Sequence, residues 1–189
     1  MECRVSPWPF GAMRPFSFDL IMADPPWGFD NYSAKGEAKN AKAQYACMST
    51  EDVCRLPVGD LAAKDCVLWL WATNPMLPEG IEVLRRWGFQ FKTAGHWSKK
   101  TVNGKQAFGT GYILRCAGEP FLIGTMGKPS FARNVRSVIE GPIREHSRKP
   151  DEAYAAAEAL CPNAINRADI FSRQVRPGWT AWGFETEKF

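Results

Sequence analysis

The chain has 189 residues, 45% of them hydrophobic and 23% charged, a balance that excludes wholesale disorder and a fibrous repeat. Lys and Arg number 24 against 20 Asp and Glu, and this small basic excess permits nucleic-acid binding without requiring it. Because no apolar run has the length of a bilayer span or a signal peptide, and the six cysteines include no Cys-x-x-Cys pair, we expect a cytoplasmic protein with no membrane contact and no metal site.

Short apolar segments alternate with amphipathic ones along the chain. In chain order we expect a strand at 18–23, a loop at 28–47, a helix beginning at Ser49, a strand at 66–72, a helix ending at Gly88, a strand at 89–97, a loop at 99–109, strands at 112–114 and 121–124, a helix at 151–160, and strands at 168–171 and 180–183. This alternation predicts an α/β fold, with a mainly parallel sheet covered by helices on both faces. We expect a single domain over residues 1–189, with 1–17 as an N-terminal extension.

The most informative motif is Asp24-Pro25-Pro26-Trp27, directly after the first apolar strand, where open α/β sheets bind ligands. The exocyclic amine of adenine is a poor nucleophile because its lone pair is delocalised into the ring. The Asp24 carboxylate and the Pro25 carbonyl can accept the two amine hydrogens and turn that pair out of conjugation, while the double proline fixes the backbone and Trp27 stacks on the base. A proline turn beside a core tryptophan is the alternative.

Further segments follow this motif in a recognisable order. They are Trp69-Leu70-Trp71-Ala72-Thr73-Asn74, Gly109-Thr110-Gly111-Tyr112, Glu119 before an apolar strand, residues 144–152, and Arg176-Pro177-Gly178-Trp179 with Trp182-Gly183. Together with the first motif, this pattern resembles the MT-A70 family of adenine-N6 methyltransferases over about residues 18–185. The resemblance implies a Rossmann-like methyltransferase fold in permuted motif order, with the catalytic segment before the donor-binding segment, and S-adenosylmethionine as the methyl donor.

The resemblance also implies a role for individual residues. The catalytic residues would be Asp24, Pro25, Pro26 and Trp27. The donor would be bound by Asp24, Lys149, Phe171, Arg173 and Glu185, and the acceptor by Tyr32, Asn74, Trp97, Tyr112, Glu119 and Arg144. Phe184 stands where the family usually has Asn, which puts donor affinity in question.

Two of these residues also have an interpretation from the sequence itself. Lys149 lies beside the positive end of the predicted helix at 151–160, which attracts anions such as a carboxylate, although an exposed cation at a capped helix is equally consistent. Glu119 could accept a hydrogen bond from a base, or be a surface carboxylate at a strand start.

We expect methylation of adenine in DNA, with RNA as the alternative acceptor. An inactive nucleic-acid-binding subunit is a third hypothesis, disfavoured because such relatives typically lose the motif aspartate, and Asp24 is present. A homodimer or a partner subunit stays open. The two loops carry six lysines, at 35, 39, 42, 99, 100 and 105, which we expect to bind phosphates. Because few wedge elements are evident, we expect faster turnover on single-stranded or mismatched DNA than on matched duplex.

Overall fold

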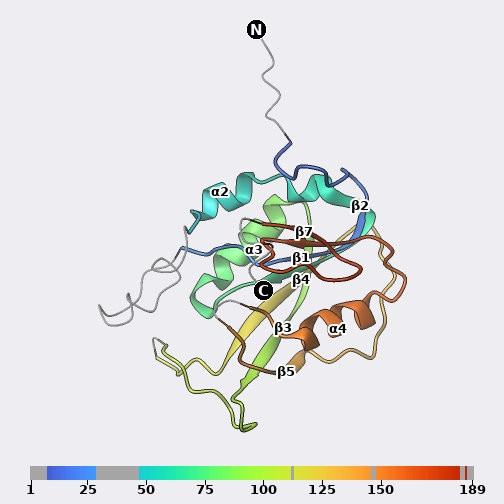
Figure 1. Ribbon diagram of the computed structural model, residues 1–189. Coiled ribbons are helices and arrows are strands. Elements are labelled where there is room, and N and C mark those ends of the chain that lie inside the picture. The colour runs from blue at the N-terminus through green and yellow to red at the C-terminus, as the bar shows by residue number, and fades with distance from the viewer. Residues whose placement is uncertain (1–7, 29–46, 112, 146–147, 184–185, 187–189) are drawn as a thin grey trace.

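The computed structural model describes residues 8–28, 47–111, 113–145, 148–183 and 186. The described strands form one seven-stranded sheet in the order β5-β3-β4-β2-β1-β6-β7 (Figure 1). Their bounds are β1 Phe18–Ala23, β2 Ala62–Trp71, β3 Gln90–Lys100, β4 Gly118–Met126, β5 Val138–Pro142, β6 Arg167–Ile170 and β7 Thr180–Trp182. The α-helices are α2 Thr50–Arg55, α3 Leu77–Arg86 and α4 Asp151–Leu160, with 3-10 turns η2 Val58–Leu61 and η3 Asn74–Met76.

The sheet is mainly parallel, as expected from the alternation of elements. Strands β2, β1, β6 and β7 pair in parallel with their neighbours in that order, and β3 pairs in parallel with β5. Only β4 runs the other way, antiparallel to both β2 and β3. Its first residues therefore lie at the edge where β2 and β3 end, which is the edge that open α/β sheets use for ligands.

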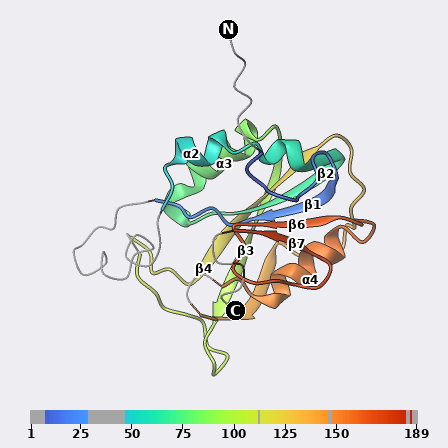
Figure 2. The same cartoon turned by 45° about the horizontal axis from the view of Figure 1, so that its top comes forward.

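Helices cover both faces of the sheet, as predicted. Figure 2 shows α2 and α3 on one side and α4 on the other. Successive side chains of a strand point to opposite faces, so Ile21 and Ala23 of β1 join the core under α2 and α3, whereas Leu20 and Met22 join the core under α4. By the same alternation, Asp24, two positions after Met22, faces the α4 side of the sheet.

The helix boundaries follow local capping. Ser49 accepts the backbone N–H of Asp52 and begins α2. Residues 74–76 form the 3-10 turn η3 before α3 begins at Leu77, and α3 stops at Arg86 before Gly88, whose φ of 84° favours glycine.

Two elements differ from the sequence-based expectation. The strand predicted at 112–114 is wrong for Ile113 and Leu114, which lie in a bend with exposed side chains, and Tyr112 lies outside the described residues. Strand β5 was not predicted, because its five residues include Gly and Pro and only two of them are buried. An apolar triplet makes a strand only where a neighbouring strand pairs with it.

The described part of the N-terminal extension belongs to the core. Phe10 is 1% exposed, and its ring packs edge-on against Trp182 of β7 at 4.9 Å between centroids. The Trp182 indole N–H donates to the Pro9 carbonyl at 3.0 Å. The segment before β1 therefore packs against β7, the last strand of the chain.

Within the described ranges, no helix has the length and apolar character needed to cross a bilayer. The same residues contain no group of three or more His, Cys, Asp or Glu side chains arranged to hold a metal ion.

Candidate active site

The candidate site lies where β1, β2 and β6 end side by side. In the register of these strands, Ala23 is opposite both Leu70 and Ile170, so the residues that follow the strands meet at one edge. A pocket opens there, and its lining residues are Met22, Asp24, Trp71, Arg148, Lys149, Tyr154, Asp169, Phe171, Ser172, Arg173 and Gln174.

A chain of alternating charges, with the buried Lys149 within it, runs along this edge. The Lys149 ammonium lies 2.7 Å from an Asp24 carboxylate oxygen and 2.8 Å from Glu119, and the side chain is only 7% exposed. The second Glu119 oxygen accepts from Lys99 at 2.9 Å. Lys149 also lies 5.3 Å from the centre of the Trp71 ring, within range of a cation–π contact. Asp24, Glu119 and the two lysines thus form one network.

The network shifts the protonation equilibria of its members. Burial raises the pKa of Asp24 above its usual value, and the Glu119 charge adds to this rise while Lys149 opposes it. Burial would also raise the pKa of Glu119, but the Lys149 and Lys99 ammoniums outweigh it and lower that pKa to about 2. For Lys149, burial would lower the pKa, but the two carboxylates outweigh it and hold the pKa above its ordinary value.

The two prolines after Asp24 present backbone carbonyls to the loop that follows. The Pro25 carbonyl accepts the Trp27 backbone N–H at 2.8 Å, and the Pro26 carbonyl accepts that of Met48 at 3.0 Å. A carbonyl oxygen has two lone pairs, so Pro25 keeps one for another donor.

Two tryptophans predicted to meet the acceptor lie in the core. Trp27 is 4% exposed and its indole N–H donates to the Trp71 carbonyl at 3.0 Å; Trp97 is 3% exposed and donates to the Gly141 carbonyl at 3.0 Å. Neither ring offers an open face for a base to stack on. The predicted roles, base stacking for Trp27 and acceptor binding for Trp97, stay predictions, and in this structure both indoles donate to backbone carbonyls near strand ends.

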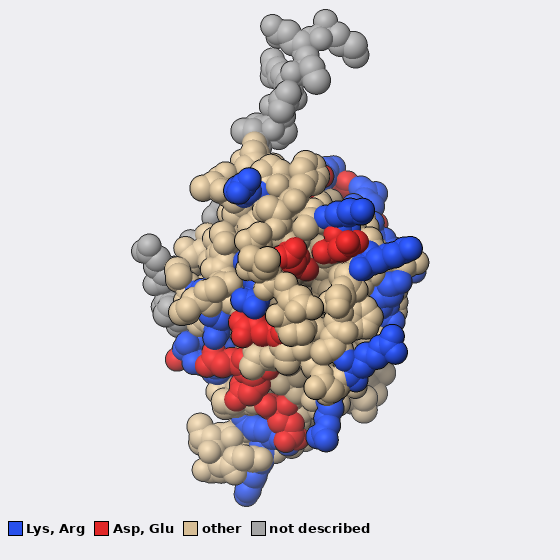
Figure 3. Space-filling model, turned by 90° about the vertical axis from the view of Figure 1, so that its right-hand side faces the viewer, with Lys and Arg blue, Asp and Glu red and all other residues tan. Residues whose placement is uncertain are grey.

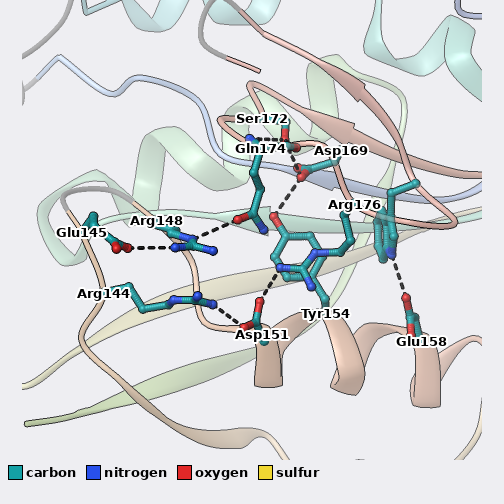
Figure 4. Close-up of polar contacts among 11 residues, drawn as sticks. Arg144, Glu145, Arg148, Asp151, Tyr154, Glu158, Asp169, Ser172, Gln174 and Arg176 are labelled. Atoms are coloured by element: carbon teal, nitrogen blue, oxygen red, sulfur yellow. Dashed lines mark hydrogen bonds and ion pairs between the residues drawn. The ribbon is translucent and has the colours of Figure 1, made fainter. Parts of the chain in front are cut away.

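A second buried carboxylate lies on the far side of the pocket. One oxygen of Asp169, in β6, accepts from the Tyr154 hydroxyl and from the Ser172 hydroxyl, each at 2.8 Å (Figure 4). Phe171 adopts a left-handed φ of 65°, rare for a residue other than glycine, at the turn that leads from β6 to Ser172. Burial raises the pKa of Asp169 to about 6, against the lowering effect of the two hydroxyls.

Arginines gather at the start of α4 (Figure 4). Arg144 and Arg176 both pair with Asp151 in the first turn of that helix, and Arg176 also stacks on Tyr154 with 3.9 Å from guanidinium to ring centre (Figure 4). Arg148 donates to the Gln174 side chain at 2.9 Å. Arg144, predicted to bind the acceptor, thus orders the start of α4.

The structure brings together some predicted site residues and separates others. Asp24, Lys149, Phe171 and Arg173 line one pocket, and Glu119 joins it through Lys149. Asn74 is exposed in the turn before α3. The predicted residues outside the described ranges are Tyr32, Tyr112 and Glu185, together with Phe184 and the loop lysines at 35, 39 and 42.

Two of the remaining loop lysines belong to a strand. Lys99 and Lys100 are the last residues of β3 and pair with Glu119 and Glu140, whereas Lys105 lies exposed in the turn beyond. The Lys99–Glu119 pair and the buried Asp169 were missed as site features. Only the strand pairing joins Lys99 to Glu119, while a carboxylate at the end of an apolar strand was a visible signal for Asp169.

The chain is similar in sequence to proteins of known families. Residues 18–185 match the MT-A70 family. The type II methyltransferase M.MunI of a Mycoplasma species is 28% identical over 186 residues, covering 89% of this chain and 77% of that protein. An N(6)-adenosine-methyltransferase MT-A70-like protein of Arabidopsis thaliana is 31% identical over 172 residues, covering 88% of this chain and 23% of that protein.

The human N(6)-adenine-specific methyltransferase METTL4 is 27% identical over 190 residues, covering 92% of this chain and 38% of that protein. The chain therefore spans well under half the length of both eukaryotic relatives. Because the family match runs from the first strand to beyond the last and includes the whole charged network, this protein belongs to the MT-A70 family.

Proposed function

We propose that this protein transfers a methyl group from S-adenosylmethionine to the N6 amine of adenine in a nucleic acid, with DNA as the favoured acceptor. The methyltransferases of this family use that donor, and its sulfonium supplies the methyl group when it is bound. The observation that carries the proposal is the position of Asp24, which directly follows β1, is held by a buried ammonium, and precedes a carbonyl with a spare lone pair.

The pocket suits a zwitterionic donor. Its lining includes a carboxylate that can bind an ammonium, Asp169, and guanidinium groups that can bind a carboxylate or hydroxyls, Arg148 and Arg173. The Trp71 indole N–H is buried with no hydrogen-bond partner among the described residues, so it is a donor that a ligand could satisfy. These groups fit the donor without a metal.

Asp24 would hold the acceptor amine. Its carboxylate accepts one amine hydrogen and the Pro25 carbonyl accepts the other, which turns the nitrogen lone pair out of the ring system. Lys149 directs two of its three N–H donors to Asp24 and Glu119. It therefore holds the Asp24 carboxylate in place without transferring a proton to it. The amine becomes cationic during transfer, and its proton then passes to Asp24 or to water.

The choice between DNA and RNA is the finer part of the proposal. A relative named for adenosine covers 88% of this chain and one named for adenine covers 92%. We favour DNA because the type II methyltransferase is the relative whose own length the chain covers most fully among those compared above.

The test offers both polymers together. The purified protein is incubated with labelled S-adenosylmethionine and equal amounts of DNA and RNA of matched sequence, and the digested nucleosides are separated. We expect label in N6-methyldeoxyadenosine. Label confined to N6-methyladenosine would move the acceptor to RNA, and no label in either would count against the enzyme and for a binding subunit.

A further inference from the structure

Between β3 and β4 the chain forms a projection, residues 101–111 and 113–117, that we call the arm. Figures 1 and 2 show it extending beyond the sheet as the yellow-green segment at the bottom of each view. It carries four large apolar side chains in open solvent: Val102 is 93% exposed, Phe108 80%, Ile113 96% and Leu114 82%. Apolar side chains gathered on one exposed element mark a contact surface rather than a folding requirement.

The base of the arm is ordered and adjoins the candidate site. The Gln106 side-chain amide donates to the carbonyls of Lys99 at 3.1 Å and Ala117 at 2.6 Å, which ties the two ends of the arm together. The Ala107 backbone N–H donates to Lys99 at 2.8 Å, and Gly109 closes the outer loop on the Cys116 carbonyl at 2.8 Å. Since Lys99 pairs with Glu119, this clamp lies directly beside the charged network.

The charge of the arm selects among possible partners. Residues 101–117 contain two basic side chains, Lys105 and Arg115, and no Asp or Glu. The Arg115 guanidinium lies 5.3 Å from the centre of the Phe108 ring, so the exposed aromatic has a cation against it. The face in Figure 3, by contrast, carries acidic and basic side chains side by side. Exposed apolar groups with only positive charge among them suit a polyanion that also presents flat apolar surfaces, which is a nucleic acid.

We propose that the arm separates bases: Phe108, with Ile113 and Leu114 beside it, enters the base stack next to the target adenine, and Arg115 and Lys105 face the phosphates. An amine inside a base pair is out of reach of Asp24 until its base leaves the stack, at a cost of a few kcal/mol. An apolar side chain that takes the vacated position offsets part of that cost. This inference rests on the proposed function and describes how the target adenine leaves the base stack.

The test compares methylation of one oligonucleotide in two forms, single-stranded and fully paired, by the chain of residues 1–189. The variants are Phe108→Ala and Leu114→Ala, and the matched control is Ile165→Ala, an equally exposed aliphatic (84%) two residues before β6, at the opposite edge of the sheet. We expect the arm variants to methylate the duplex about 5- to 150-fold more slowly, the range for one stacked base, with single-stranded turnover close to wild type. Fluorescence of 2-aminopurine placed at the target should rise on binding wild type and Ile165→Ala, and rise less with Phe108→Ala.

Three results would overturn the proposal. An equal loss on both forms, or no loss on either, would show that the arm does not act on the base stack. A wild-type dimer in sedimentation velocity that Phe108→Ala converts to monomers would assign the apolar tip to a second protein chain. Failure of the proposed function itself looks different, because wild type would then methylate neither form of DNA nor RNA.

Discussion

Replacing Lys149 by Met should destabilise the fold far more than the loss of an ordinary lysine. The side chain is 7% exposed, and its ammonium bridges Asp24 and Glu119 at 2.7 and 2.8 Å. Removing one partner of a buried ion pair costs about 3–5 kcal/mol, because it leaves uncompensated charge. Methionine retains most of the apolar contacts of the lysine side chain, so the loss of unfolding free energy would come from the missing charge. Lys99→Met is the control: that side chain is 26% exposed and pairs with one carboxylate, so it should cost about 1 kcal/mol or less.

The loss should also depend on pH with a definite sign. The pKa of Glu119 is lowered to about 2 from 4.5, so its contribution to stability is present above pH 4.5 and is lost as the pH falls through 2. Without Lys149 most of that contribution is absent at every pH. The gap in unfolding free energy between wild type and variant should therefore be widest at neutral pH and narrow towards pH 2.

Urea denaturation followed by tryptophan fluorescence, at neutral pH and near pH 3, measures both effects. The double variant Lys149→Met with Glu119→Gln should regain part of the lost stability, since one of the stranded charges is gone. A loss no larger than that of Lys99→Met, or one that is equal at both pH values, would refute the account of the charged network.

Four further outcomes are expected. Asp24→Ala should lower methyl transfer by at least about 100-fold while calorimetry still shows donor binding; near-wild-type turnover would remove Asp24 from the reaction. Calorimetry should show S-adenosylmethionine binding in the presence of a chelator and weaker binding by Arg173→Ala, and loss of binding on chelation alone would contradict the donor site. Asp169 has a pKa raised from 3.8 to about 6. The unfolding free energy of wild type should therefore fall by at most about 3 kcal/mol as the pH rises through that window, whereas that of Asp169→Asn should not. Urea denaturation that gives the same change between pH 4 and 7 for both proteins would argue against this effect. Methylation rates should fall at higher salt, because phosphate contacts release counterions, and a flat salt response would exclude such contacts.

Local features of the site were predictable from the sequence. The apolar run of β1 and the two prolines after Asp24 fix a strand end and a turn through neighbouring residues alone. The same holds for α4, whose alanine-rich segment begins where expected, at Asp151.

Features that depend on distant pairing were not predictable. Glu119 meets Lys99 and Lys149 because β4 is reversed, which places its start beside the ends of its neighbours. No pattern within those segments encodes that reversal. Trp27 shows the same limit, because the sequence of the motif is the same whether the indole stacks on a base or donates to a buried carbonyl.

The arm bears on one expectation from the sequence. The preference for single strands stays a prediction, but it assumed few wedge elements, and Ile113 and Leu114, predicted to lie in a strand, are exposed in the same arm as Phe108. Apolar residues are assigned to a core by default, and only the structure shows that these have no core to join.

We infer that the nitrogen held by Asp24 receives the methyl group. The most direct measurement uses DNA whose adenine carries ¹⁵N at the exocyclic position, incubated with methyl-labelled S-adenosylmethionine and wild type or Asp24→Ala, followed by mass spectrometry of the nucleosides. Wild type should yield adenine with the labelled methyl bonded to the labelled nitrogen, and the variant should yield almost none. A methyl group on a ring nitrogen or on another base, or equal product from the variant, would contradict it.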